Sequence, residues 1–312
     1  MRIFMSKRWI RQIIFPLLAA IIWGTAFVFQ SDAAELIGPF TFNAVRCAMG
    51  AAFLTLILLA KDIFYKRSRR AEGAKVPSGR RDCKALWIGG ALCGIMLAGA
   101  ANLQQLGLGE AAPGKAAFIT SLYVILVPVL GLFFRKRVSP VIWGSIVLVV
   151  IGLYFLCVKE KMQIEKSDFF LFLCALCFAF HIMVVDRVSD RVDGMELSCV
   201  QFLVASLISG VGMLLTETVT WSALLACLWP LFYVGVFSGG IAYTLQILAQ
   251  KNSNPTVVSM LFCLESVFAV LADGLITGAW LTGREWIGSS IMLIAIMMAQ
   301  LPEGVFKRKK GT

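Results

Sequence analysis

Long apolar stretches follow one another along almost the entire chain, separated by short polar connections. A helix needs about 20 apolar residues to cross a bilayer, because each residue adds only about 1.5 Å. The 312 residues are 59% hydrophobic and 15% charged, with a mean hydropathy of +0.83, whereas soluble domains carry about 25% charged residues. The sequence therefore predicts an all-α integral membrane protein.

Ten such stretches fit the chain, because one span with its connection takes roughly 30 residues. Prolines at positions 39, 113, 140 and 255 lie at or just before the start of a stretch, where the missing N–H costs no helical hydrogen bond. We expect ten membrane-spanning helices, at residues 13–31, 38–60, 85–107, 115–134, 140–158, 168–186, 195–216, 223–249, 255–276 and 285–301.

Basic residues gather in alternate connections. If the N-terminus lies inside, 23 of the 29 Lys and Arg residues fall in cytoplasmic segments and five in outer ones, and Arg46 lies within a span. Cytoplasmic connections hold the excess of basic residues, so we expect both ends, 1–12 and 302–312, in the cytoplasm, with the protein in the inner membrane of a bacterium. The net charge of +11 then follows from topology and needs no nucleic-acid partner. The basic connection 61–84 is expected to contact anionic lipid headgroups, and a homodimer is left open.

The start of the chain has the basic-then-apolar order of a signal peptide. We expect a retained first span instead, because about 18 apolar residues exceed the usual length of the apolar region of such a signal. Its removal would also break the repeat described next.

Residues 86–123 are repeated 142 positions later. Apolar composition alone would produce matching leucines and alanines, but not three rarer residue types in one register. These rarer matches are Trp87 with Trp229, Gln104 with Gln246, and Pro113 with Pro255.

The repeat predicts a duplication of five spans, with one copy over 13–158 and the other over 168–301. Because five is odd, the second copy must enter the membrane from the opposite face. Such inverted repeats are typical of secondary transporters, whose substrate sites lie near the middle of the membrane between the two copies.

Glu265 lies about ten residues into the expected span 255–276, and therefore about 15 Å deep. An ionisable group in hydrocarbon costs at least ~2.5 kcal/mol, so it usually faces a wet cavity and marks a solute or proton path. We interpret Glu265 as a group that takes a proton or binds a cationic substrate.

Arg46 lies about 12 Å from the outer end of the second expected span. It could bind the carboxylate of a substrate, pair with a buried acid, or extend outward to the membrane surface. The sequence leaves these three interpretations open.

Depth and the internal repeat select further candidates for a substrate pathway. Tyr123 occupies the position paired with Glu265, and Gln201 lies in the region of the seventh span that corresponds to Arg46. The other candidates are Trp23, Thr25, Gln104, Tyr243 and Gln246. Glutamines also join membrane helices to one another, so Gln104 and Gln246 have that alternative role.

His181, the single histidine, is a candidate proton relay together with Glu265; a hydrogen-bonded packing role is the alternative. An intramembrane enzyme or lipid-handling protein could use Glu265 and His181 as acid and base. Two acid/base residues without a recognisable nucleophile or metal site are weak evidence for catalysis. The five-span duplication is specific evidence for alternating access, so we favour a carrier over an enzyme.

Motifs of ATP-driven pumps and common hydrolases are missing from the sequence, which has no P-loop, no Gly-x-Ser-x-Gly and no His-Glu-x-x-His. An ATP-driven pump within this chain is therefore excluded. Nine cysteines form no disulfide or metal pattern, and Cys174 and Cys177 lie inside a span, where apolar packing explains them. We expect no cofactor and no metal.

Several short motifs, in order along nearly the whole chain, resemble the EamA-type members of the drug/metabolite transporter superfamily. They are Ile22-Trp23-Gly24-Thr25-Ala26-Phe27, Phe42-Asn43-Ala44-Val45-Arg46, Gly114-Lys115-Ala116-Ala117-Phe118-Ile119 leading to Leu122-Tyr123-Val124 and Pro128-Val129, Leu264-Glu265-Ser266-Val267-Phe268, and Arg284-Glu285-Trp286-Ile287-Gly288.

The resemblance implies ten spans and export of small metabolites, amino acids or drugs. The chain departs from the family pattern at Ser266, where the family often has proline. It also has Arg135-Lys136 and Gly278-Ala279 where the family often has a Gly-Glu pair. These departures count against mechanisms that need the missing carboxylates.

The distribution of basic residues makes the orientation testable. Single cysteines in a cysteine-free background should react with an impermeant maleimide on intact cells within 159–167, but only after permeabilisation within 61–84 and 303–312. Labelling of both termini from outside would reverse the orientation, and termini on opposite sides would contradict ten spans.

Overall fold

The computed structural model describes residues 10–71, 82–111, 113–135, 138–158, 165–278 and 280–299. Helices are the only regular elements in these ranges, and nine of them are long and apolar enough to cross a membrane. The predicted all-α membrane class is confirmed. The predicted basic tail 302–312 and most of the segment 1–12 lie outside the described residues.

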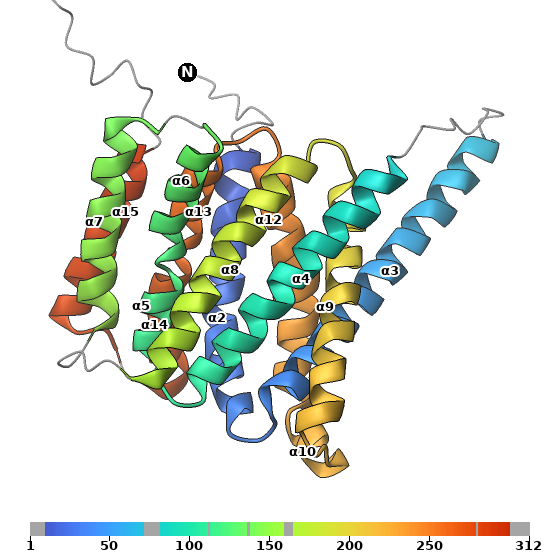
Figure 1. Cartoon of the computed structure of the whole chain (residues 1–312), viewed down its shortest axis with the longest axis horizontal. Coiled ribbons are helices and arrows are strands. Elements are labelled where there is room, and N and C mark those ends of the chain that lie inside the picture. The colour runs from blue at the N-terminus through green and yellow to red at the C-terminus, as the bar shows by residue number, and fades with distance from the viewer. Residues whose placement is uncertain are drawn as a thin grey trace, which may run out of the picture.

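The elements of the first half, shown in Figure 1, are the π-helix η1 (Ile10–Ile14) and the α-helices α2 (Phe15–Ala34), α3 (Pro39–Ala71), α4 (Cys83–Leu108), α5 (Pro113–Thr120), α6 (Tyr123–Phe133) and α7 (Pro140–Cys157). Those of the second half are α8 (Lys166–Val188), α9 (Gly194–Thr216), α10 (Trp221–Ala226), α11 (Leu228–Phe232), the π-helix η2 (Tyr233–Ala242), α12 (Tyr243–Gln250), α13 (Pro255–Phe262), α14 (Glu265–Thr277) and α15 (Gly283–Ala299).

The nine apolar helices agree with the first nine predicted spans. α15 has the place predicted for the tenth and packs against α7 at one end of the molecule (Figure 1). Its 17 described residues extend over roughly 25 Å at about 1.5 Å per residue. A tenth complete span therefore stays a prediction.

The connection predicted at 61–84 is shorter than expected, because α3 continues to Ala71. Lys66 pairs with Asp62 one turn away at 3.1 Å, and Lys61 pairs with Asp193 at 3.4 Å. Oppositely charged side chains four residues apart stabilise a helix outside the hydrocarbon. The helix α3 can therefore continue through this polar segment. Residues 72–81 lie outside the described ranges, and the predicted lipid contact of this segment stays a prediction.

Two spans are interrupted near their middle, where the sequence predicted continuous helices. The breaks at 121–122 and 263–264 separate α5 from α6 and α13 from α14. At each break backbone N–H groups bond three residues back, as from Leu122 to the Ile119 carbonyl at 3.1 Å, which tightens the chain locally. The two breaks lie 142 positions apart, in the register of the internal repeat.

The predicted span 223–249 is also composite, since α11, η2 and α12 follow one another along it. The π-helix η2 packs closely on α3. A Cβ atom added at Gly235 would lie 2.8 Å from the carbonyl oxygen of Arg46. The glycine therefore lets the two backbones touch.

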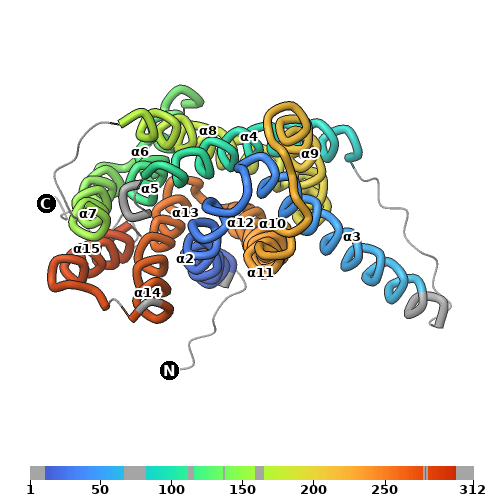
Figure 2. The backbone as a smooth tube through the Cα atoms, turned by 90° about the horizontal axis from the view of Figure 1, so that it is seen from below, coloured from blue at the N-terminus to red at the C-terminus, as the bar shows by residue number. Residues whose placement is uncertain are grey.

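Several helix contacts have a counterpart when the two halves of the chain are exchanged. Equivalent helices pair directly, α3 with α9 and α7 with α15. In addition α4 packs on α8 and α9 as η2 packs on α2 and α3, and α6 packs on α8 as α14 packs on α2. Figure 2 shows α2, α12, α13 and α14 gathered beside one another, with α3 projecting at the far end. This reciprocal packing supports the predicted duplication.

Exposed tryptophans mark where the helices leave the hydrocarbon. Among the described residues, the tryptophans with large exposed fractions lie near the ends of spans or in the connections, namely Trp87, Trp221, Trp229, Trp280 and Trp286. Tryptophan is enriched at membrane–water interfaces because its ring is amphipathic. The positions of these tryptophans agree with helices that cross the bilayer from one surface to the other.

The crossing of α7 and α15 depends on glycine and gives a test of the fold. A Cβ atom at Gly288 would lie 2.6 Å from the Gly152 carbonyl oxygen and 2.7 Å from the Leu156 nitrogen. We expect Gly288→Ala to destabilise the protein by about 1–3 kcal/mol, the usual cost of overpacking. Gly144→Ala, where no atom lies within 4 Å of the new Cβ, should be neutral or stabilising. Equal unfolding midpoints of the two purified variants in detergent would contradict this packing.

Candidate functional site

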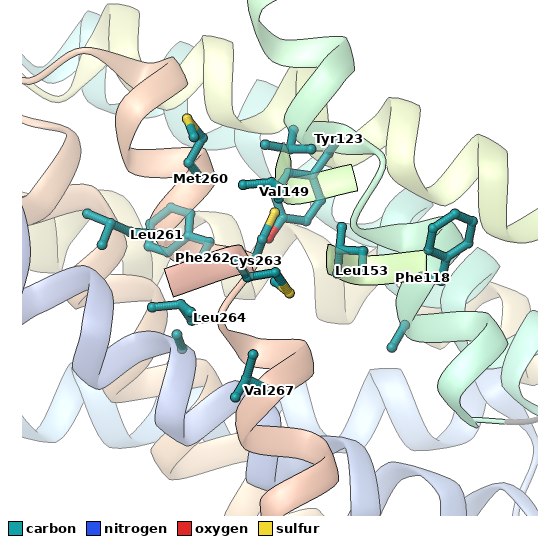
Figure 3. Packing of buried hydrophobic residues seen from close by; sticks show 14 of the residues in the cluster. Phe118, Tyr123, Val149, Leu153, Met260, Leu261, Phe262, Cys263, Leu264 and Val267 are labelled. Carbon is teal, nitrogen blue, oxygen red and sulfur yellow. The ribbon is translucent and has the colours of Figure 1, made fainter. Parts of the chain in front are cut away.

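The two interrupted helices meet at their breaks. The Ser121 and Ser266 hydroxyl oxygens are 3.1 Å apart, and the Cys263 thiol lies 3.8 Å from the Ser121 carbonyl oxygen. In Figure 3, Tyr123 and Cys263 lie side by side where the two segments approach each other. The breaks therefore cover one another within the protein, away from lipid.

Glu265 and Tyr123 begin the second parts of the two interrupted helices. The Tyr123 hydroxyl donates to Glu265 Oε1 over 3.2 Å, and both side chains are buried. The two positions that the repeat pairs in sequence are thus hydrogen-bonded to each other. Glu265 also lies in the first turn of α14, where the helix dipole favours a negative charge.

Gly24 brings α2 onto the start of α14. A Cβ atom at Gly24 would lie 2.6 Å from Phe268 Cβ and 2.7 Å from the Glu265 carbonyl oxygen. Trp23 and Phe27 lie four residues apart on a neighbouring face of the same helix. The motif around Trp23-Gly24 therefore serves both helix packing and the lining of the space beside Glu265.

A partly open cavity lies beside the two breaks. Aromatic side chains make up much of its wall, and polar groups are spaced between them. The described residues that line it are Trp23, Phe27, Gln30, Arg46, Gln104, Tyr123, Phe178, Ile182, Ser238, Tyr243, Gln246, Phe262 and Glu265. An apolar and aromatic wall with a few polar groups is typical of a small-molecule site.

Seven of the nine predicted pathway residues lie in this wall, namely Trp23, Arg46, Gln104, Tyr123, Tyr243, Gln246 and Glu265. Thr25 is not among the described lining residues, and its hydroxyl donates to the Ile21 carbonyl over 3.0 Å. Depth alone suggested Thr25, but two residues turn a helix by about 200°. Thr25 and Trp23 therefore point in different directions.

Part of the wall follows the internal repeat. A shift of 142 positions relates Gln104 to Gln246 and Tyr123 to Glu265, and a shift of 155 relates Trp23 to Phe178 and Phe27 to Ile182. The shift of 155 also relates Arg46 to Gln201, which is not among the described lining residues. The second shift could have identified Phe178 and Ile182 from the sequence. Sequence reasoning missed both, together with Phe27, Gln30, Ser238 and Phe262.

Arg46 is 4% exposed and lies in the cavity wall. Its Nε donates to Asn43 Oδ1 over 2.6 Å, and its guanidinium carbon lies 5.8 Å from the centre of the Phe42 ring. Among the described residues, no carboxylate forms a salt bridge with it. These contacts count against an extension to the membrane surface and against a pair with a buried acid, and anion binding stays a prediction.

His181 is fully buried behind Tyr243. Its Nε2 lies 2.9 Å from Gln201 Oε1, and the His181 and Tyr243 rings meet edge to face with centres 5.9 Å apart. Neither His181 nor Gln201 is among the described residues that line the cavity. The proton relay through His181 stays a prediction.

Two fully buried polar atoms in the wall have no protein partner among the described residues. They are Trp23 Nε1, a donor, and Gln246 Oε1, an acceptor. The amide nitrogen of Gln246 donates to Gln250 Oε1 over 3.1 Å, and Gln250 donates to the Ile182 carbonyl over 2.8 Å. Gln246 thus joins helices through Gln250 and still offers its oxygen to a ligand.

The chain is similar to known proteins over nearly its whole length. The EamA-like transporter family matches residues 10–158 and 165–300. The chain belongs to this family. The EamA-like chain is 25% identical over 293 residues to an uncharacterized transporter of Archaeoglobus fulgidus, covering 91% of this chain and 84% of the relative. It is 23% identical over 285 residues to the uncharacterized transporter YoaV of Bacillus subtilis, covering 89% and 90%.

A solved crystal structure has the same fold, with a TM-score of 0.73 at 16% identity, covering 95% of this chain and 99% of the other. The family and the relatives identify the EamA-like chain as a multi-pass transporter. The expectation of a transporter is confirmed at this level.

The bond between Tyr123 and Glu265 can be tested without a substrate. A hydrogen bond to the charged form of a carboxyl group favours that form, and carbodiimides react with the neutral acid. In Tyr123→Phe we therefore expect dicyclohexylcarbodiimide to modify Glu265 several-fold faster, as measured by mass spectrometry of the peptide. Tyr154→Phe, on the exposed side of α7, is the control. Equal rates in the wild type and Tyr123→Phe would contradict the bond.

Proposed function

We propose that the protein is a secondary carrier that exports small metabolites, amino acids or drugs by alternating access around the cavity beside Glu265. The observation that carries the proposal is the meeting of two interrupted spans at a cavity that holds a buried carboxylate and a buried guanidinium. Interrupted helices at membrane depth are tolerated only where protein or a wet cavity covers them. In secondary transporters they form substrate and ion sites.

The reciprocal helix packing supports alternating access. In a chain made of two inverted copies, exchanging the conformations of the copies turns an outward opening into an inward one at little difference in energy. The residues of the wall would then face each side of the membrane in turn. Both termini lie in the cytoplasm in this proposal, and the membrane is the plasma membrane of a bacterium.

Glu265 is the coupling or recognition group in this proposal. Its first role is to take up and release a proton during the cycle, and its second is to bind a cationic group of the substrate. Tyr123 holds the carboxylate in either role, since its hydroxyl donates to Oε1.

The substitution Glu265→Gln separates these roles, because it keeps shape and hydrogen bonding but removes the titrating group. Purified protein in proteoliposomes would be tested with a panel of amino acids and drugs, with and without a pH gradient, and the released solute would be checked for chemical change. If Glu265 couples protons, we expect gradient-driven accumulation to fall at least tenfold while exchange continues. If it binds a cationic substrate, exchange should fail as well.

Glu110→Gln is the matched control, since the same change is made at an exposed carboxylate beyond the end of α4. A purely structural role predicts that transport scales with the amount of folded protein. Wild-type rates of Glu265→Gln in both assays would remove Glu265 from the mechanism. A chemically altered solute would contradict a carrier.

A further inference from the structure

A chain of buried polar side chains holds Arg46 in place. Arg46 Nε donates to Asn43 Oδ1 at 2.6 Å, Asn43 Nδ2 donates to Asn102 Oδ1 at 3.0 Å, and Asn102 Nδ2 donates to Ser209 Oγ at 2.8 Å. Asn43 and Ser209 are 0% exposed and Asn102 is 6% exposed. The chain runs from α3 through α4 to α9, so it joins three spans.

Two backbone carbonyls fix the direction of this chain. Asn43 Nδ2 also donates to the Pro39 carbonyl at 2.9 Å, and Asn102 Nδ2 donates to the Ala98 carbonyl at 2.8 Å. A carbonyl oxygen only accepts, so each amide nitrogen must lie on the side of its carbonyl. The remaining Asn43 oxygen therefore has to face Arg46, and it takes the Nε–H.

The same bond decides which side of the guanidinium is left for a ligand. Arginine has five N–H groups, and the four on its terminal nitrogens donate to no described residue. Since Arg46 lies in the cavity wall, the terminal pair forms the available face. Two parallel N–H groups match the two oxygens of a carboxylate.

The charges and rings of the surrounding wall limit further which class of ligand can bind. Arg46 is the only Lys or Arg among the described lining residues, so the wall carries a net charge of +1 when Glu265 is protonated. A monoanion then matches this charge, whereas a dianion leaves one negative charge uncompensated in a site of low polarity. The rings of Trp23, Phe178 and Phe262 offer an apolar surface for the rest of the molecule.

We propose that the substrate carries a carboxylate on an apolar body, and that Asn43, Asn102 and Ser209 are positioning residues that aim Arg46 at this carboxylate. The inference rests on the proposed carrier function, since it names the class of substrate for the same cavity. None of the three positioning residues lines the cavity, so they act through Arg46.

The class of substrate is tested with three small probes on the purified full-length protein. Benzoate is a planar monoanion, benzamide has the same shape without the charge, and phenyl phosphate carries a tetrahedral dianion. A ligand of the folded state raises the unfolding midpoint. We expect benzoate to raise it, benzamide and phenyl phosphate to have little effect, and Arg46→Gln to lose the response. No response to benzoate, or an equal response to benzamide, overturns the proposal, and a stronger response to phenyl phosphate replaces it with a phosphate site.

The positioning role is tested by the benzoate concentration that gives half of the midpoint shift. Asn43→Asp can still accept from Arg46 Nε but loses both donated bonds and adds a charge next to the guanidinium. We expect roughly a tenfold higher half-saturating concentration, the equivalent of one lost bond to a charged group. Ser209→Ala is a smaller change, and this variant should fold. We expect it to raise the half-saturating benzoate concentration about threefold.

Ser206→Ala is the matched control, because Ser206 lies one turn from Ser209 on α9 and donates to the Ala44 carbonyl, apart from the chain to Arg46. A merely structural role would lower the unfolding midpoint without changing half-saturation. Wild-type half-saturation in both Asn43→Asp and Ser209→Ala therefore overturns the positioning role.

Transport in proteoliposomes separates this inference from the carrier function on which it rests. Benzoate binding without movement of any solute would retain the carboxylate site and reject the carrier. Movement of other solutes without benzoate binding would retain the carrier and reject the carboxylate as the substrate class.

Discussion

The contact between the two interrupted helices is the constraint on which the rest of the structure depends. A break inside a membrane helix frees backbone groups that lipid cannot satisfy, so each break must be covered by protein. Here the breaks cover each other, and Ser121, Ser266 and Cys263 supply the polar contacts between them. Gly24 then lets α2 approach the start of α14. The cavity forms beside this crossing, and Glu265 lies in its wall.

The predicted internal repeat accounts for part of the cavity wall, while the two charged residues depart from it. Paired glutamines and paired apolar side chains lie in the wall. The two charges occur where the repeat pairs unlike residues, because Glu265 is opposite Tyr123 and Arg46 corresponds to Gln201. In the proposed carrier, a two-fold scaffold would reverse its opening at small cost, and the asymmetric pair of charges would hold a substrate in one orientation.

Arg46 also shows how a membrane protein keeps a charge at depth. Burying an arginine in hydrocarbon costs at least ~2.5 kcal/mol, and a single hydrogen bond to Asn43 together with the Phe42 ring offsets only part of that cost. The terminal nitrogens remain directed to the cavity, where water or a ligand can hydrate or bind them. Because Asn43, Asn102 and Ser209 belong to three different helices, the direction of the guanidinium depends on how α3, α4 and α9 are placed relative to one another.

Several properties were determined by the sequence itself, because they depend on local composition and on register. Hydropathy predicted the all-α membrane class and the first nine spans, and the shift of 142 positions paired Tyr123 with Glu265. Depth along each span and the internal repeat then selected nine residues, of which seven line the cavity. The sequence did not predict that α3 extends to Ala71. Its charged residues indicated a connection, but charged residues also form a helix where that helix has left the hydrocarbon.

Only the tertiary structure decided which face of each helix meets the cavity and where a helix is interrupted. The side chains of Thr25 and Trp23 lie at similar depth but point in different directions. Gln201 is hydrogen-bonded to His181, and neither residue is among those described as lining the cavity. The breaks at 121–122 and 263–264 carry no proline or glycine, so no local signal marks them. Each break is stabilised by the other across 142 residues of chain, and such a contact between distant segments exists only after the helices have packed.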